Sequence, residues 1–140
     1  MLTDLLTRIE RGEPVEAQEV FDFAVGKVIE QGAPAINGDG CAYRNHLGQK
    51  CAFGHLIPDS LYKHSFENVT AVGILTEGLS KTNLQYSPAL AASLECHVSL
   101  ITSIQRAHDN EAHCDGASFV SNFRHRAEAV AATHGLTFKF

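Results

Sequence analysis

The stretch CAYRNHLGQKCAFG, residues 41–54, decides the fold class, because it adds strand pairing to a chain that is otherwise helical in its periodicity. It follows Asn37-Gly38-Asp39-Gly40, a run of residues typical of turns. Alternating side chains on both sides of a second glycine-containing turn then indicate paired strands. The sequence therefore predicts a small β-hairpin near residues 41–53.

The loop of this hairpin sets its register. A three-residue loop over 46–48, in which Gly48 takes the left-handed conformation, places Arg44 opposite Lys50 and Tyr43 opposite Cys51. Alternation along the strands then predicts a core face of Cys41, Tyr43, Cys51 and Phe53 and an opposite face of Ala42, Arg44, Lys50 and Ala52. A loop of two or four residues would instead divide the two cysteines between the faces.

Helical patterns occupy most of the remaining chain. We expect helices over 2–11 with Thr3 as cap, from Pro14 in a first turn to Gly32, over 56–62, over 87–108, and from Asp115 or Ser118 to Gly135. Residues 65–86 supply core side chains without a clear element, and 137–140 form a strand or fray. The predicted fold is a mostly helical α+β domain, residues 1–140, with about five helices and one hairpin.

Charge and hydropathy exclude several classes of function. Sixteen acidic and eleven basic residues give the 140-residue chain a net charge of −5, which disfavours nonspecific binding to nucleic acid. Charged residues interrupt every long apolar stretch, and the first ten residues do not resemble a signal peptide. We therefore expect a cytoplasmic protein without a membrane segment. A homo-oligomer is compatible with the sequence.

The outer face of the predicted hairpin suggests a binding site. Two cations directly opposite each other destabilise a strand pair unless an anion lies between them. Asp59 or Glu67 would serve, as would an anionic ligand or an acidic partner, and the alternative is two solvated side chains at the hairpin edge. This face and Tyr62 form the first half of the candidate site.

The second half lies at the end of the long predicted helix. Gln105 and His108 fall within its apolar stripe, and Asp109 follows directly. Buried amide and imidazole groups need partners, so they either satisfy the backbone of a loop or form a working site. If a site exists, we expect it where these seven residues converge: Arg44, Lys50, Asp59, Tyr62, Gln105, His108 and Asp109.

The cysteines and histidines allow two further hypotheses. In a cytosolic chain we expect reduced thiols rather than disulfides, and a packed cysteine is the commonest case. Zinc is the one cofactor suggested, through ligands of suitable type and loose spacing: Cys41, His46, Cys51 and His55, with His97 and His113 as further candidates. A thiol-dependent hydrolase or transferase would use Cys51 or Cys41 as nucleophile, His108 as base and Asp109 or Asp59 as the orienting carboxylate.

One block of the sequence resembles a known group. The pattern CxYRxxxGxKCAxGxLIPDxxY over Cys41–Tyr62 resembles a family of small uncharacterised proteins of phages, prophages and bacteria. Its members often have a helix ending LQxxHD, to which Ile104–Asp109 is similar, and a final helix ending Gly-Leu, here Gly135-Leu136. The tryptophan expected in that last helix is absent, and Phe119 or Phe123 would take its place.

The resemblance implies a setting rather than a reaction. We expect a small acidic binding protein of phage or mobile-element type that sequesters or inhibits a bacterial protein or small anionic ligand, for example an anti-defence or anti-CRISPR inhibitor. The acidic surface of the first two helices, with Glu10, Glu13, Glu16 and Glu19, would suit a partner that normally binds nucleic acid. Catalysis by a thiol and a zinc-stabilised interaction module remain the alternatives. Sequence-specific DNA binding ranks below them, because no predicted helix carries a series of base-reading side chains.

Overall fold

The computed structural model describes residues 4–38, 40–78, 84–112 and 116–140. Its helices are α1 (Leu5–Glu10), α2 (Ala17–Gln31), α3 (Ala52–His55), α4 (Ala71–Leu75), α5 (Pro88–Leu94), α6 (Val98–Asn110) and α7 (Gly116–Thr133). The strands β1 (Ile36–Asn37) and β2 (Gly40–Cys41) form a two-stranded antiparallel sheet, and η1 (His64–Phe66) and η2 (Glu95–His97) are 3-10 turns. The predicted α+β class, mostly helical with one small hairpin, is confirmed.

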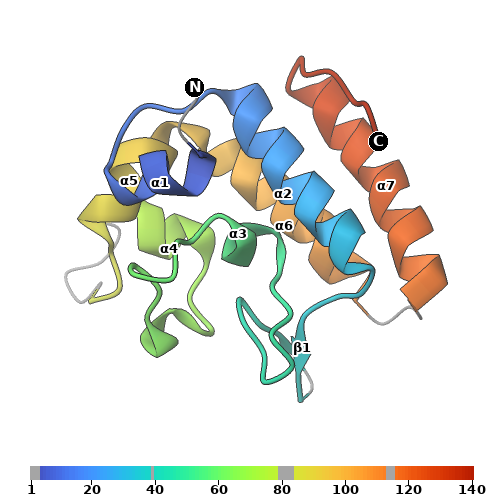
Figure 1. Ribbon diagram of the computed structural model, residues 1–140, viewed down its shortest axis with the longest axis horizontal. Coiled ribbons are helices and arrows are strands. Elements are labelled where there is room, and N and C mark those ends of the chain that lie inside the picture. The colour runs from blue at the N-terminus through green and yellow to red at the C-terminus, as the bar shows by residue number, and fades with distance from the viewer. Residues whose placement is uncertain (1–3, 39, 79–83, 113–115) are drawn as a thin grey trace.

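Three long helices, α2, α6 and α7, pack against one another and form one side of the molecule (Figure 1). The buried residues of α7 recur every fourth position, which places them on one helix face. They are Phe119, Phe123, Ala127 and Ala131. The shorter helices α1, α4 and α5 lie together beside this group, and α3 contacts both α2 and α6. The segment with β1 and β2 projects from one end of this arrangement (Figure 1).

Helix ends agree with the sequence in part. Ser87 caps α5 by accepting from the Leu90 N–H, and Gly32 ends α2 with a left-handed φ of 76°. The predicted first turn at Pro14 is wrong, because α2 begins only at Ala17, behind a capping box of Glu16 and Glu19. Asp4 caps α1, and Thr3, Asp115 and His113 lie outside the described residues. Ser118 lies within α7 and is not its cap.

Two predicted helices are wrong in extent. The helix expected over 87–108 is interrupted at Glu95–His97 and continues as α6, although the apolar stripe runs across the break. The helix expected over 56–62 instead occupies Ala52–His55, and a turn follows at Pro58. The tail after α7 forms no strand among its described residues. It packs on α2 instead, through Phe138 on Phe21.

The predicted hairpin is placed correctly at its tip and wrongly in its extent. Arg44 and Lys50 form an antiparallel bridge, and Gly48 in the loop has a φ of 78°, as the three-residue loop predicts. The regular strands lie earlier in the chain, with Ile36 paired to Cys41. The second predicted strand does not extend past Cys51, because the chain turns there into α3 with the Cys51 thiol as cap. The hairpin over 41–53 is therefore reduced to this bridge.

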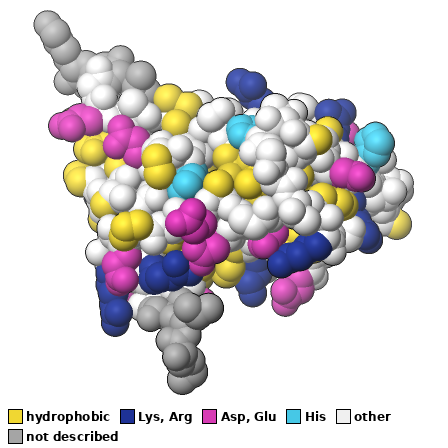
Figure 2. Space-filling view, turned by 90° about the horizontal axis from the view of Figure 1, so that it is seen from above, with side chains coloured by type: hydrophobic (Ala, Val, Ile, Leu, Met, Phe, Trp, Pro, Cys, Tyr) yellow, Lys and Arg dark blue, Asp and Glu magenta, His cyan; other side chains and the backbone are white. Residues whose placement is uncertain are grey.

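The predicted core face is right at three of its four positions. Tyr43, Cys51 and Phe53 are buried, whereas Cys41 is exposed. Ala42 and Ala52, expected on the outer face, are buried as well. Strict alternation fails because α3 replaces the second strand and covers the side that two-stranded pairing would leave open. On the face seen in Figure 2, acidic and basic side chains lie interspersed rather than gathered by sign. No helix in the described ranges is long and apolar enough to cross a bilayer.

Candidate functional site

The seven residues expected to converge form two neighbouring groups rather than one. We call Arg44, Lys50 and Asp59 the basic cluster, and we call Cys41, Gln105, His108 and Asp109 the α6 network. Tyr62 belongs with the basic cluster. The side chain of Glu67 lies between the two groups, since it contacts residues of the first and lines a cavity beside the second.

The basic cluster is built on the Arg44–Lys50 bridge. Asp59 Oδ1 lies 2.8 Å from Nη1 of Arg44 and 3.9 Å from Nζ of Lys50, so one carboxylate separates the two cations. The side chains of Arg44 and Lys50 are 19% and 31% exposed, whereas that of Asp59 is 86% exposed. This geometry agrees with the expectation that an acidic side chain, Asp59, lies between the two cations. The cations are set into the surface, and their counter-ion lies outside it.

Arg44 is held in place by groups other than Asp59. Its Nη2 donates to the backbone oxygen of Ile57 at 2.8 Å, and its guanidinium lies over the Tyr62 ring, 4.3 Å from the centroid. Its Nε is buried and has no acceptor among the described residues. The guanidinium is therefore fixed before any external anion arrives.

Glu67 anchors the chain on which the basic cluster is built. Its two oxygens accept from the backbone N–H groups of Tyr43 and Arg44, at 3.0 and 3.2 Å, and from the Tyr62 hydroxyl at 2.5 Å. Burial, together with this hydrogen bond, raises the pKa of Tyr62 to about 12, so the phenol stays protonated and donates. Glu67 thus stabilises the backbone, and among the described carboxylates it is Asp59 that lies within ion-pair distance of both cations.

The α6 network centres on the carboxylate of Asp109. Its Oδ1 accepts from Gln105 Nε2 at 2.8 Å and from His108 Nδ1 at 2.9 Å, and the carboxylate also accepts from the Cys41 thiol. Burial alone would raise the pKa of Asp109, but hydrogen bonds from His108, Gln105 and Cys41 outweigh it and lower the pKa. Asp109 is therefore an ionised acceptor and not a general acid.

His108 has both ring nitrogens engaged. The side chain is fully buried, and Nε2 lies 3.2 Å from the backbone N–H of Ala35. Because that N–H can only donate, Nε2 is the acceptor, and Nδ1 carries the proton it donates to Asp109. Gln105 behaves similarly, accepting from the Phe53 N–H at 2.9 Å. His108 thus satisfies the backbone of a loop, as the first of the two alternatives predicts, whereas Gln105 satisfies an N–H in the first turn of α3.

The two cysteines considered as nucleophiles, Cys41 and Cys51, lack the features of an activated thiol. Although Cys41 as a whole residue is exposed, partial burial of its thiol raises the pKa of Cys41 to about 12, with a further contribution from the Asp109 charge. Burial also raises the pKa of Cys51, which lies fully inside and caps α3 by accepting from the Gly54 N–H. Neither thiol faces a free imidazole nitrogen of His108, since both are occupied. This arrangement does not supply the base that a thiol hydrolase requires.

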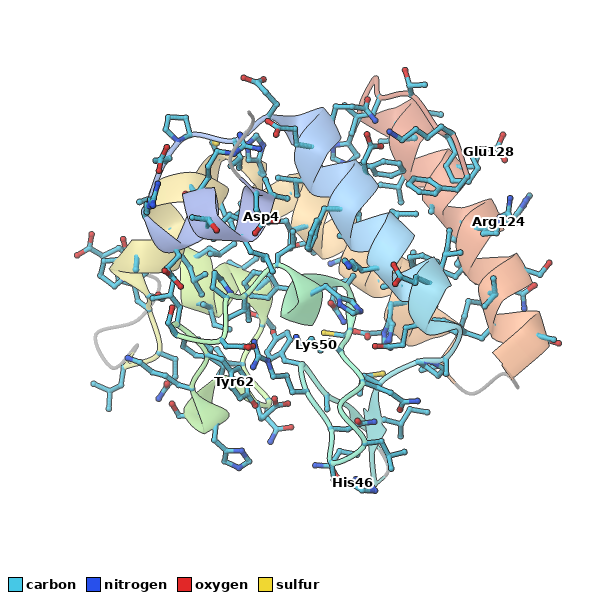
Figure 3. All side chains as sticks on the ribbon, viewed as in Figure 1. Asp4, His46, Lys50, Tyr62, Arg124 and Glu128 are labelled. Atoms are coloured by element: carbon cyan, nitrogen blue, oxygen red, sulfur yellow. The ribbon has the colours of Figure 1, made fainter. Side chains whose placement is uncertain are left out.

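The histidines and cysteines with zinc-type spacing do not assemble as expected. His46 lies exposed at the hairpin tip (Figure 3), and Cys51 is buried as a helix cap. Within the described residues, the group of possible ligands that does assemble is Cys41, His108 and Asp109, whose ligand atoms lie within 4.8 Å of one another. This set does not suit a metal, because His108 would have to give up its Nδ1 proton and turn Nε2–H against Ala35.

His55, a candidate ligand in the zinc hypothesis, has a buried ring nitrogen and a lowered pKa. Its Nε2 is buried without a hydrogen-bond partner among the described residues. Burial, with the charges of Lys50 and Lys27, lowers the pKa of His55 to about 4. His55 is therefore neutral at physiological pH and adds no charge to the basic cluster.

We expect His55 to make the protein sensitive to acid. Between pH 6.5 and pH 4, His55 is protonated in the unfolded chain but stays neutral in the folded chain. The free energy of unfolding therefore falls as the pH falls through this window. After allowance for partial exposure, the loss is about 1–2 kcal/mol. Urea unfolding at both ends of the window measures it. His55→Gln should remove this loss and His64→Gln, at an exposed position, should retain it; an unchanged pH dependence in His55→Gln would contradict the assignment.

A cavity of about 400 Å³ lies beside the α6 network. It is lined by residues 41–43, by residues 67–72 and by side chains of α6. Thr102 and Arg106 line it together with Asp109, and sequence reasoning did not single out these first two residues. Thr102, Arg106 and Asp109 are separated by four and three residues, which places them on one helix face. This spacing is the sequence feature from which Thr102 and Arg106 could have been predicted.

Comparison with protein-family models, curated proteins and solved structures finds no significant match to this chain. The resemblance of the 41–62 block to phage and prophage proteins therefore stays a prediction. The candidate site has to be interpreted from its own geometry.

Proposed function

We propose that this chain is a cytoplasmic, non-enzymatic binding protein that sequesters a small anionic ligand at the basic cluster. The observation that carries the proposal is the placement of two half-buried cations, Arg44 and Lys50, around one exposed carboxylate. In the phage-type setting that the resemblance implies, removing such a ligand from the bacterial cell would be an anti-defence function.

The energetics favour exchange of Asp59 for an external anion. An ion pair with a partner as exposed as Asp59 contributes only about 0–1 kcal/mol, so its loss costs little. Asp59 Oδ1 reaches Lys50 only at 3.9 Å, which is too long for a hydrogen bond. A phosphate or carboxylate group with several oxygens could contact both cations at hydrogen-bond length. Arg44 needs no rearrangement, because Ile57 and Tyr62 already hold it.

The polar side chains of the α6 network support binding over catalysis. Asp109 is kept ionised, both nitrogens of His108 are occupied, and the thiol pKa values are raised. Part of the acidic surface of the first two helices is already engaged, since Arg8 forms an ion pair with Glu19 and Ser60 donates a hydrogen bond to Glu10. The basic cluster is therefore the better candidate for a charged ligand.

Titration with inorganic phosphate tests the proposal. Asp59→Asn removes the internal competitor and should bind phosphate at least about threefold more tightly than the natural sequence, whereas Lys50→Gln should bind it at least about tenfold more weakly. Lys63→Gln, which changes an exposed lysine outside the cluster, should leave the affinity unchanged. Isothermal titration calorimetry measures all three.

Native mass spectrometry of the protein purified from bacteria provides the second measurement. We expect a mass above the denatured mass by that of a retained anion, and we expect Lys50→Gln to lose it. A bare native mass, together with no phosphate binding by Asp59→Asn at millimolar concentration, would contradict the proposal.

A further inference from the structure

One face of α6 lines the 400 Å³ cavity with a row of polar side chains. Thr102, Arg106 and Asp109 follow one another at intervals of four and three residues, which stacks them along the helix. The walls add apolar surface from Val69, Ala71 and Val72. A volume of about 400 Å³ lies within the range of small-molecule sites. The cavity thus combines an apolar wall with charged groups of both signs.

Arg106 and Asp109 have a spacing at which opposite charges on a helix normally pair. No ion pair between them is present in the described structure. Asp109 instead accepts from Gln105, His108 and Cys41. Arg106 is exposed and has no partner among the described residues. The two charges therefore stay apart and both border the cavity.

The remaining carboxylate of the cavity does not compete for a ligand. Glu67 lines the wall, but its oxygens are taken by two backbone N–H groups and the Tyr62 hydroxyl. Asp109, in contrast, accepts from both Gln105 and His108 through Oδ1, and its side chain is 41% exposed. A ligand would therefore meet one available negative group and one available positive group, about one helical turn apart.

We infer that this cavity binds a small zwitterion such as a dipeptide, with its anionic end at Arg106 and its ammonium group at Asp109. The apolar wall at Val69 and Val72 would contact one of its side chains. This site is separate from the basic cluster and goes beyond the function proposed above.

The dipeptide Ala-Leu is the probe, and calorimetric titration is the measurement. Its two blocked forms, N-acetyl-Ala-Leu and Ala-Leu amide, each lack one charge and should each bind at least about tenfold more weakly. Arg106→Gln should weaken binding of Ala-Leu by a similar factor. Arg124→Gln is the matched control, because Arg124 is exposed and lies on α7, away from the segment that carries Lys50 and Tyr62 (Figure 3).

Three results of the Ala-Leu titrations would overturn the inference. They are no binding of Ala-Leu at millimolar concentration, equal binding of the blocked and free forms, and unchanged binding by Arg106→Gln. Phosphate titration of Arg106→Gln separates this site from the basic cluster, since that variant should bind phosphate like the natural sequence. A parallel loss of both ligands would assign them to one site and overturn the inference as well.

Discussion

Gly54→Ala is expected to destabilise the protein by about 3 kcal/mol, the largest effect we expect from a single-methyl addition at the glycines whose surroundings the structure describes. A Cβ atom at Gly54 would lie 2.1 Å from the carbonyl oxygen of Tyr43 and 3.0 Å from its carbonyl carbon. These are backbone atoms, so neither can rotate away as a side chain would. Either α3 or the strand before the hairpin loop has to move, and both support the basic cluster.

Thermal unfolding followed by circular dichroism measures this effect. For a domain of this size we expect the melting temperature to fall by roughly 8–12 °C. Gly40→Ala is the matched control, because a Cβ there meets nothing within 4 Å and its φ is not positive. It should change stability by less than about 0.5 kcal/mol. Equal stabilities of the two variants would show that Gly54 has no packing role.

His108→Leu is expected to cost about 3 kcal/mol. The His108 ring packs edge-to-face on the Phe119 ring, with 5.5 Å between the two ring centroids. Leucine keeps an apolar side chain at this position in the core, so the loss of stability results mainly from the lost hydrogen bonds. The substitution leaves the buried N–H of Ala35 without an acceptor and removes one donor from Asp109. A polar group buried without a partner costs about 1–3 kcal/mol, and the weakened Asp109 network adds to it.

Urea unfolding at pH 7 measures the change, with His125→Leu on the exposed side of α7 as control. The control should remain within about 0.5 kcal/mol of the natural sequence. Nitrogen NMR of the imidazole provides an independent test, since the structure requires a proton on Nδ1 and none on Nε2. A stable His108→Leu variant, or a proton on Nε2, would contradict the structural role of His108.

Local rules predicted the tip of the hairpin and several helix ends. The register of Arg44 and Lys50 followed from loop length and Gly48, because a left-handed residue and a three-residue turn determine pairing without help from the rest of the chain. The caps at Ser87 and Gly32 are local in the same sense. The expectation that an acidic side chain would separate the two cations also needed only their pairing.

Other elements depended on contacts between distant segments. Alternation predicts that the second hairpin strand continues to residue 53, whereas packing against α2 and α6 favours the helix α3 from Ala52. The apolar stripe from Leu90 to Ile104 gives no sign of the break at η2, since the periodicity continues across it. Pro14 lies before α2 rather than in its first turn, because the helix begins at Ala17 behind the capping box of Glu16 and Glu19.

The sequence by itself determined the mostly helical α+β class, the hairpin turn and the pairing of Arg44 with Lys50, because each rests on short-range patterns of side chains and glycines. Only the tertiary structure decided that Gln105, His108 and Asp109 form a network with Cys41, and that Arg106 borders a cavity. The partner of His108 is Ala35, 73 positions away, and the partner of Gln105 is Phe53, 52 positions away. Hydrogen bonds over such separations follow from how helices pack, and local sequence patterns contain no record of that packing.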